Sequence, residues 1–171
     1  MPGCKYGGKS YSSCTITVVF DPSSWQGVLT VTGQNHGDPG PTALLTADVV
    51  GGPHTPMGSY HASYWETDHV SKKYGSLADT PYSKTLLGGN AFGPYQLHIQ
   101  ELESRGIYIH GTTEESNIGR PASFGCIRMR SRDVLRVFDE TPVGAKVEIL
   151  NCPIKLAVAQ ALAEHRAVAS N

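Results

Sequence analysis

Short β-branched runs separated by frequent Gly and Pro constrain the fold of this chain more than any other feature of its sequence. The 171 residues include 19 Gly and 11 Pro, and clusters of these residues favour turns between short strands. The first two runs, residues 15–20 and 25–32, flank residues 21–24, whose Asp, Pro and Ser are typical of a turn. We therefore expect a mainly β fold that begins with a hairpin.

Later runs of the same kind predict the rest of the sheet. Strands are expected at residues 43–50, 59–65, 90–100, 106–110 and 146–150. Residues 66–89 are polar and show little periodicity, which predicts a long excursion between strands. Loops of that length within compact domains are usually functional or disordered.

Two helices complete the expected order of elements. Ser131 is expected to cap a short helix with Asp133 in its first turn, where a negative charge is favourable. Pro153 is expected to open an Ala-rich helix that runs to about residue 168. The predicted organisation is a loose lead-in (residues 1–13), one domain (residues 14–151) and a helical extension (residues 152–171).

Composition and charge argue against several classes of function. The net charge of -1 provides no basic excess for nucleic acid or a membrane surface. No apolar run is long enough to span a bilayer, and the histidines show no metal-ligand spacing. Residues 1–8 lack the apolar segment of a signal peptide. Either a signal segment was removed, or the protein reaches its substrate by another route.

The four cysteines leave several disulfide patterns open. Cys126 is the candidate for a reactive thiol, so three cysteines remain and one bridge leaves a cysteine over. Cys4 can pair with Cys14, or Cys14 can pair with Cys152. The alternative is that no bridge forms.

Residues 107–129 contain the strongest signal for chemistry. His110 follows a strand-like run, and 15 residues separate it from Cys126. A thiol becomes a strong nucleophile when a neighbouring His takes its proton, and nearby positive charge lowers its pKa. Three arginines follow the cysteine, and the backbone N–H groups of Gly125 and Cys126 are candidates to stabilise an oxyanion. The alternative to a catalytic pair is that Cys126 is a small buried side chain and His110 is a hydrogen-bonding residue without a catalytic role.

Several ordered motifs resemble the YkuD-type L,D-transpeptidases. His110-Gly111 is followed by Ser123-Phe124-Gly125-Cys126-Ile127-Arg128, similar to the family's His-Gly and Ser/Thr-His-Gly-Cys signature. Residues 55–60, 90–95 and 142–147 are similar to the family's Thr-Pro-x-Gly-x-Phe/Tyr, Asn-Pro-hydrophobic-Gly-Pro-Tyr and Pro-Val-Gly-Thr-x-Val elements. The resemblance covers roughly residues 14–151, and several motifs in order are more specific than one alone.

The resemblance implies a YkuD-like β-sandwich with few helices and a cysteine-dependent transfer reaction. Cys126 would attack the carbonyl before a terminal D-Ala of peptidoglycan stem peptides, with His110 as base and Gly111 orienting its ring. Backbone groups of Phe124 and Gly125 would support the oxyanion, and Ser123, Arg128 and Tyr108 would contact substrate. The resemblance implies no metal or organic cofactor, no nucleic acid and a periplasmic or cell-wall location, with secretion as an effector also open. It leaves the oligomeric state open.

Phe124 departs from the family pattern, which has His at this position. A Phe ring cannot carry a proton, so His98 is a candidate substitute, although a structural role for His98 is the preferred interpretation. Three functions remain open: an L,D-transpeptidase, an L,D-carboxypeptidase that uses the same site with water, and a peptidoglycan-binding module with weak or lost catalysis. A papain-like protease is disfavoured because its nucleophile precedes its His.

Overall fold

The computed structural model describes residues 2–67, 92, 95–112, 115–118, 120 and 123–151. Eight strands form a closed barrel in the order β10-β3-β4-β5-β9-β8-β7-β6. The mainly β fold is confirmed, and the sheet expected as a sandwich is continuous around the barrel. The strands are β3 (Ser13–Phe20), β4 (Gln26–Gln34), β5 (Thr42–Val50), β6 (Gly58–Thr67), β7 (Tyr95–Ile99), β8 (Tyr108–His110), β9 (Ile127–Met129) and β10 (Lys146–Asn151).

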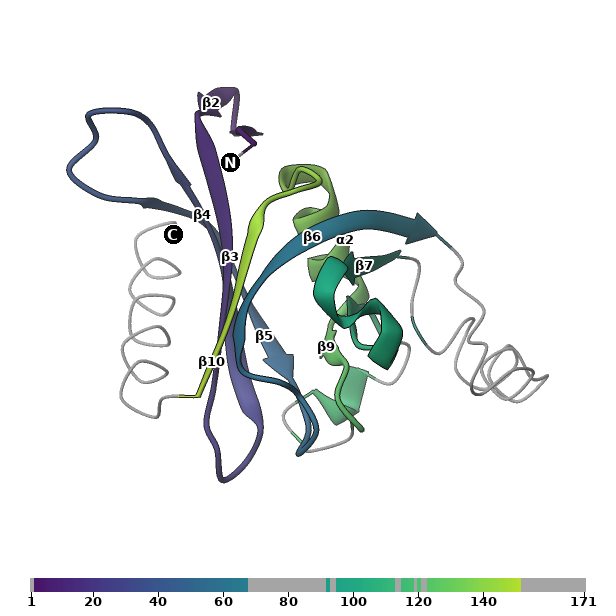
Figure 1. Cartoon of the computed structure of the whole chain (residues 1–171). Helices are drawn as coiled ribbons and strands as arrows, with labels where there is room; N and C mark the ends of the chain where they lie inside the picture. Colours follow the sequence, from purple (N-terminus) through teal and green to yellow (C-terminus); the bar gives the residue numbers. More distant parts are fainter. Residues whose placement is uncertain are drawn as a thin grey trace.

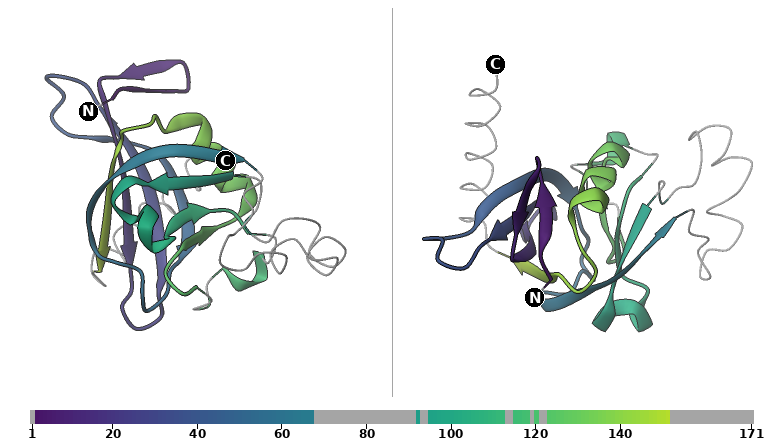
Figure 2. Two further views of the ribbon diagram at one scale, coloured as in Figure 1. Left: turned by 45° about the vertical axis from the view of Figure 1, so that its right-hand side comes forward. Right: turned by 90° about the horizontal axis from the view of Figure 1, so that it is seen from above.

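The long strand β6 closes the barrel because it curves and pairs with two different strands, β10 and β7. Its first part pairs antiparallel with β10 and its second part pairs antiparallel with β7, with an irregularity between Ala62 and Trp65 (Figures 1 and 2). Alternate side chains of the strands point inward and are fully buried, as period-two patterning requires. We call the part of the barrel formed by β7, β8 and β9 the site half, and its inward residues are Leu97, Ile99, Ile109, Ile127 and Met129.

The helix α2 (Ser131–Glu140) covers part of the core. Val134 and Val137 are fully buried, whereas Leu135 is 40% exposed and does not contribute to the apolar stripe expected from the sequence. The capping prediction is wrong by one position, because Arg130 is the N-cap residue and supplies no side-chain hydrogen bond. Ser131 is the first helical residue instead, and its hydroxyl donates to the carbonyl of Thr112 at 3.0 Å.

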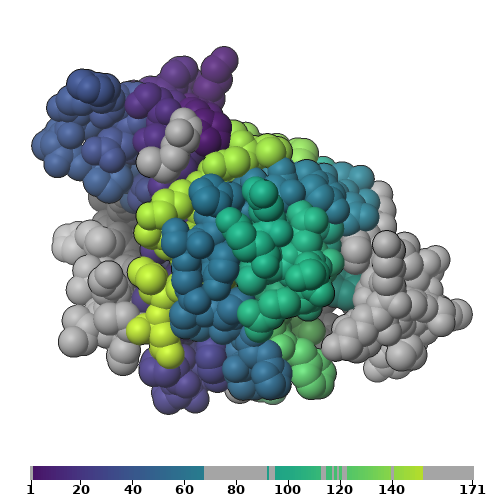
Figure 3. Space-filling model, viewed as in Figure 1, coloured from purple at the N-terminus to yellow at the C-terminus, as the bar shows by residue number. Residues whose placement is uncertain are grey.

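The N-terminal segment that was expected to be a loose lead-in forms a small hairpin. Strands β1 (Cys4–Tyr6) and β2 (Lys9–Tyr11) pair antiparallel beside the start of β3. A disulfide joins Cys4 to Cys14, with 5.9 Å between their Cα atoms. The hairpin and the neighbouring β4–β5 turn project from one corner of the surface (Figure 3). The structure thus selects one of the open pairings, while Cys152 lies outside the described residues.

Two 3₁₀ segments connect the strands of the site half, η2 (Gln100–Arg105) and η3 (Glu115–Asn117). No helix within the described part of the chain has the length and apolarity to cross a membrane. Most of the excursion expected at residues 66–89 lies outside the described residues, as does the expected C-terminal helix after residue 152.

Candidate active site

Two adjacent parallel strands bring His110 and Cys126 to the same side of the barrel. In this pairing Ile109 lies opposite Ile127, and His110 lies opposite Arg128. Both isoleucines are buried in the core, so their immediate neighbours along each strand face outward. Cys126 directly precedes β9 and therefore lies on the same outward side as His110. We call this outward side of β7, β8 and β9 the site face.

The orientation of the His110 ring is set by its own backbone neighbour. Its Nδ1 lies 2.5 Å from the carbonyl oxygen of Gly111, and the side chain is 1% exposed. When Nδ1–H donates to this carbonyl, Nε2 of the neutral ring is the nitrogen that can accept a proton. Phe92 packs edge-on against the ring, with 4.9 Å between centroids. The contact with Gly111 is the one that the family resemblance implied.

Cys126 is a half-buried thiol outside the disulfide. Its Sγ lies 3.4 Å from the carbonyl oxygen of Gly106, just before β8. Tyr108 lies two residues after Gly106. Burial raises the pKa of its phenol, and the negative charge of a Cys126 thiolate raises this pKa further. The phenol therefore keeps its proton at neutral pH.

The loop that carries Cys126 is braced by buried hydrogen bonds. Ser123 Oγ donates to the Cys126 carbonyl at 2.5 Å and accepts from the Gly125 N–H at 2.9 Å. Thr55 Oγ1 accepts from the Gly52 N–H at 2.9 Å and donates to the Gly125 carbonyl at 3.0 Å. Gly125 has φ of 154°, a conformation that favours glycine. Residues 52–55 therefore hold the cysteine loop in place.

These bonds change two expectations drawn from the sequence. Ser123 is 8% exposed and uses its hydroxyl within the loop, so its predicted contact with substrate, which stays a prediction, requires that these bonds change. The Gly125 N–H is occupied by Ser123, so its predicted oxyanion role requires that this bond be released. Sequence reasoning missed the bracing role of Thr55 and Gly52. The Thr-Pro-x-Gly motif at residues 55–58 was the available signal for it.

The side chain of Phe124 is largely exposed. It is 74% exposed, although it directly follows the buried Ser123. Its backbone belongs to the loop that carries Cys126.

The arginines after Cys126 have different surroundings. Arg128 lies beside His110 on the site face, as the strand register requires. Arg130 instead pairs with Asp48, with Nη1 3.0 Å from Oδ2, and Arg132 is 77% exposed next to Asp133. Of the three arginines, Arg128 is therefore the one that the register places on the site face.

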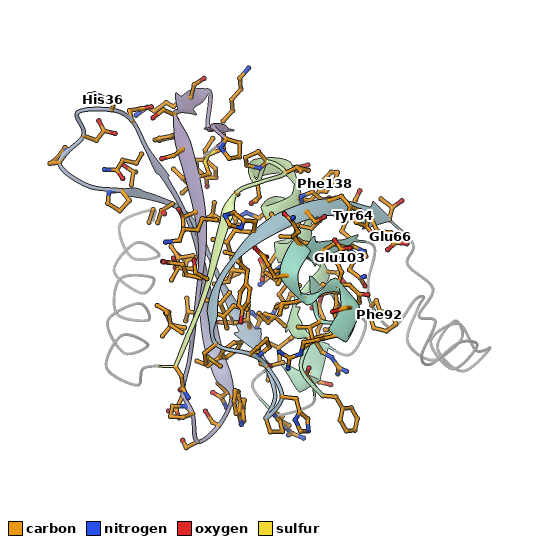
Figure 4. The ribbon with its side chains drawn as sticks, viewed as in Figure 1. His36, Tyr64, Glu66, Phe92, Glu103 and Phe138 are labelled. Carbon is orange, nitrogen blue, oxygen red and sulfur yellow. A yellow bond between two sulfur atoms is a disulfide. The ribbon has the colours of Figure 1, made fainter. Side chains whose placement is uncertain are left out.

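A further polar group occupies the site face. His98 lies opposite Tyr108 in the β7–β8 pairing and is 4% exposed. Its Nε2 lies 2.7 Å from Oε2 of Glu66 and 3.2 Å from the side-chain nitrogen of Gln96. Tyr64, Glu66 and Glu103 lie near one another around the end of β6 and η2 (Figure 4). Sequence analysis identified His98 but not Glu66, which lies 32 residues away.

The geometry as a whole is suited to acyl transfer through sulfur. It combines a thiol, an imidazole with one nitrogen fixed by a carbonyl, and a rigid loop next to the thiol. Residues 15–149 match the family model YkuD, described as an L,D-transpeptidase catalytic domain. The chain therefore belongs to the YkuD family.

Similar proteins agree with this assignment. The chain is 32% identical over 103 residues to a probable L,D-transpeptidase, YbiS of Escherichia coli, and 41% identical over 69 residues to ErfK/SrfK of Salmonella typhimurium, named in the same way. These matches cover 59% and 40% of this chain but 29% and 21% of the relatives. The chain thus corresponds to less than a third of either relative.

Solved L,D-transpeptidase structures share the fold. The structure from Stackebrandtia nassauensis superposes with a TM-score of 0.56 at 21% identity, covering 88% of this chain and 60% of that chain. L,D-transpeptidase 3 of Mycobacterium tuberculosis, in complex with a faropenem-derived adduct, gives 0.54 at 21% identity, covering 84% and 65%. At this level of identity the likeness supports the fold.

Proposed function

We propose that the chain is a cysteine-dependent L,D-transpeptidase that acts on peptidoglycan stem peptides through a thioester. The observation that carries this proposal is the shared site face of Cys126 and His110, with Nδ1 of His110 held by the Gly111 carbonyl. That contact directs the basic Nε2 away from the backbone carbonyl and makes it the proton acceptor. Membership of the YkuD family supports the same reaction class.

In the first proposed step, Nε2 of His110 takes the thiol proton and Sγ of Cys126 attacks the carbonyl before the terminal D-Ala. The C–N bond then breaks, and the departing amine of D-Ala receives the proton from His110. A thioester on Cys126 remains. A backbone N–H of the loop, such as that of Gly125 after its release by Ser123, would stabilise the intermediate oxyanion, a contribution worth on the order of 3 kcal/mol.

In the second step, an amine of an acceptor peptide attacks the thioester and the thiol leaves. The amine loses its proton to His110, which returns it to the sulfur. Water in place of the amine would give an L,D-carboxypeptidase. Arg128 has the charge and planar shape to hold a substrate carboxylate, and Tyr108 offers a neutral phenol on the strand next to Cys126.

The location that this substrate requires is outside the cytoplasm. The disulfide between Cys4 and Cys14 supports that location, because such bridges form and persist in oxidising compartments. We therefore propose a periplasmic or cell-wall location, with delivery as a secreted effector as the alternative.

The direct test is incubation with purified tetrapeptide muropeptides, with products read by mass spectrometry. Cross-linked dimers or exchanged terminal residues support the transferase, and tripeptide alone would indicate the carboxypeptidase. Cys126→Ala is the matched control and should yield neither product. Muropeptide binding without any product in the native chain would support the binding module and contradict both enzymatic proposals.

A further inference from the structure

His98 occupies a position where an ordinary strand would carry an apolar or exposed residue. Its neighbours Leu97 and Ile99 point into the core, whereas His98 points to the site face and is still 4% exposed. A buried polar side chain is costly unless its hydrogen bonds are made. Glu66 makes one such bond from β6, at 2.7 Å. The His98–Glu66 hydrogen bond therefore offsets the cost of burying the imidazole, unlike a typical pair of exposed side chains.

Aromatic rings enclose His98 on both sides. Tyr64 stacks on it with 4.0 Å between centroids and an interplanar angle of 19°. Tyr108 lies on the other side at 4.6 Å and 52°. Rings at these distances make favourable contacts. An imidazole that is tied to Glu66 and stacked on Tyr64 therefore provides a fixed surface for the ring of Tyr108.

The strand register places His98 and Tyr108 in line with Cys126. His98 lies opposite Tyr108 across β7 and β8, and the next strand contributes Cys126 directly before Ile127, the partner of Ile109. Tyr108 thus lies between His98 and Cys126 on one row across the sheet. Burial, and after it the negative charge of a Cys126 thiolate, raises the pKa of the Tyr108 phenol, in keeping with this placement. The charged groups around the row are Glu66 on β6 and Glu103 on η2, and His110 and Arg128 face each other on the next row.

We propose that His98, held by Glu66, is a positioning residue that fixes the phenol of Tyr108 beside Cys126, where the hydroxyl stabilises the thiolate. The proposal rests on the proposed role of Cys126 as nucleophile. A neutral hydroxyl that donates to a thiolate favours the ionised form. The arrangement also accounts for Phe124: the imidazole that the family has in the cysteine loop is missing, and support for the thiolate comes from the neighbouring strands.

The test measures thiolate formation directly and does not depend on turnover. The rate of iodoacetamide alkylation of the peptide that contains Cys126 is followed against pH in the full chain. His98→Leu should shift the midpoint upward by about one pH unit and slow alkylation roughly tenfold at pH 7. Tyr108→Phe should do the same, and the double variant should match Tyr108→Phe alone.

His61→Leu is the matched control. His61 also contacts a glutamate at 2.7 Å, but this pair with Glu101 is exposed, and His61 pairs with Lys146 of β10 rather than with β7. Its pH profile should equal that of the native chain. If His98→Leu fails to fold, Glu66→Gln replaces it and should shift the midpoint in the same direction.

An unchanged midpoint in a folded His98→Leu or Glu66→Gln variant would overturn the proposal, even if thermal stability falls. Equal shifts from His98→Leu with and without the Tyr108 hydroxyl would also overturn it, because the effect would then bypass Tyr108. Failure of the proposed function has a different signature. In that case, the shifts and their coupling are present, but muropeptides are not converted.

Discussion

Thr55→Val tests whether residues 52–55 hold the cysteine loop. Val has nearly the shape of Thr but lacks the hydroxyl, so the change leaves the Gly52 N–H and the Gly125 carbonyl without their partner at 2.9 and 3.0 Å. Thr55 is 4% exposed, so water cannot easily replace the bond. A buried polar group left unsatisfied costs about 1–3 kcal/mol, which predicts a total loss of roughly 3 kcal/mol in the free energy of unfolding.

The assay is urea unfolding together with the rate of Cys126 acylation. We expect the acylation rate to fall by about tenfold or more, since a loosened loop no longer holds the sulfur in place. Thr55→Ser keeps the hydroxyl and should retain most of the stability and rate. Thr30→Val, on the outward side of β4, is the control and should change stability by less than about 0.5 kcal/mol. A Thr55→Val variant as stable and reactive as this control would refute the bracing role.

Three further predictions concern single features. Replacing Cys4 and Cys14 with Ser opens a loop with a sequence separation of 10 and should lower the free energy of unfolding by about 3 kcal/mol, measured by denaturant titration; an unchanged midpoint would contradict this. Burial, and after it nearby negative charge, raises the pKa of Tyr108 above its ordinary value of 10.0. The unfolded chain therefore loses this proton at a lower pH than the folded chain, and the free energy of unfolding falls as pH rises from about 9 to 11. Thermal melts over this pH range should show a smaller loss of stability for Tyr108→Phe than for the native chain. Phe124→His should change the acylation rate by less than about tenfold because the native ring is exposed, whereas a thousandfold gain would mean that the native chain is nearly inactive.

Much of the barrel could be predicted because its strands are long and patterned. The runs that became β3, β4, β5 and β10 alternate or are rich in β-branched residues, so they were predicted within a few residues. The strand β9 was not predicted, although β8, which is equally short, lies within the strand expected at residues 106–110. Trp25 was assigned to a strand, but it adopts φ of 57° in the turn, a conformation that local composition does not reveal for a bulky residue.

The candidate site was predictable where its residues lie in motifs and not where they meet through the fold. His110, Gly111 and Cys126 were identified in advance, and the structure places the first and last on one face. The bond between His98 and Glu66 joins residues 32 apart and depends on the curvature of β6. The same limit applies to Thr55 and Gly125, which lie 70 residues apart.

Acylation by a carbapenem tests the central claim most directly. Incubating the chain with imipenem and mapping the mass increase should place one adduct on the peptide that contains Cys126. Cys126→Ala should remove the adduct, and His110→Gln should slow its formation by about a hundredfold or more. An adduct that is absent, that forms at another residue, or that forms at the native rate in His110→Gln would contradict the account.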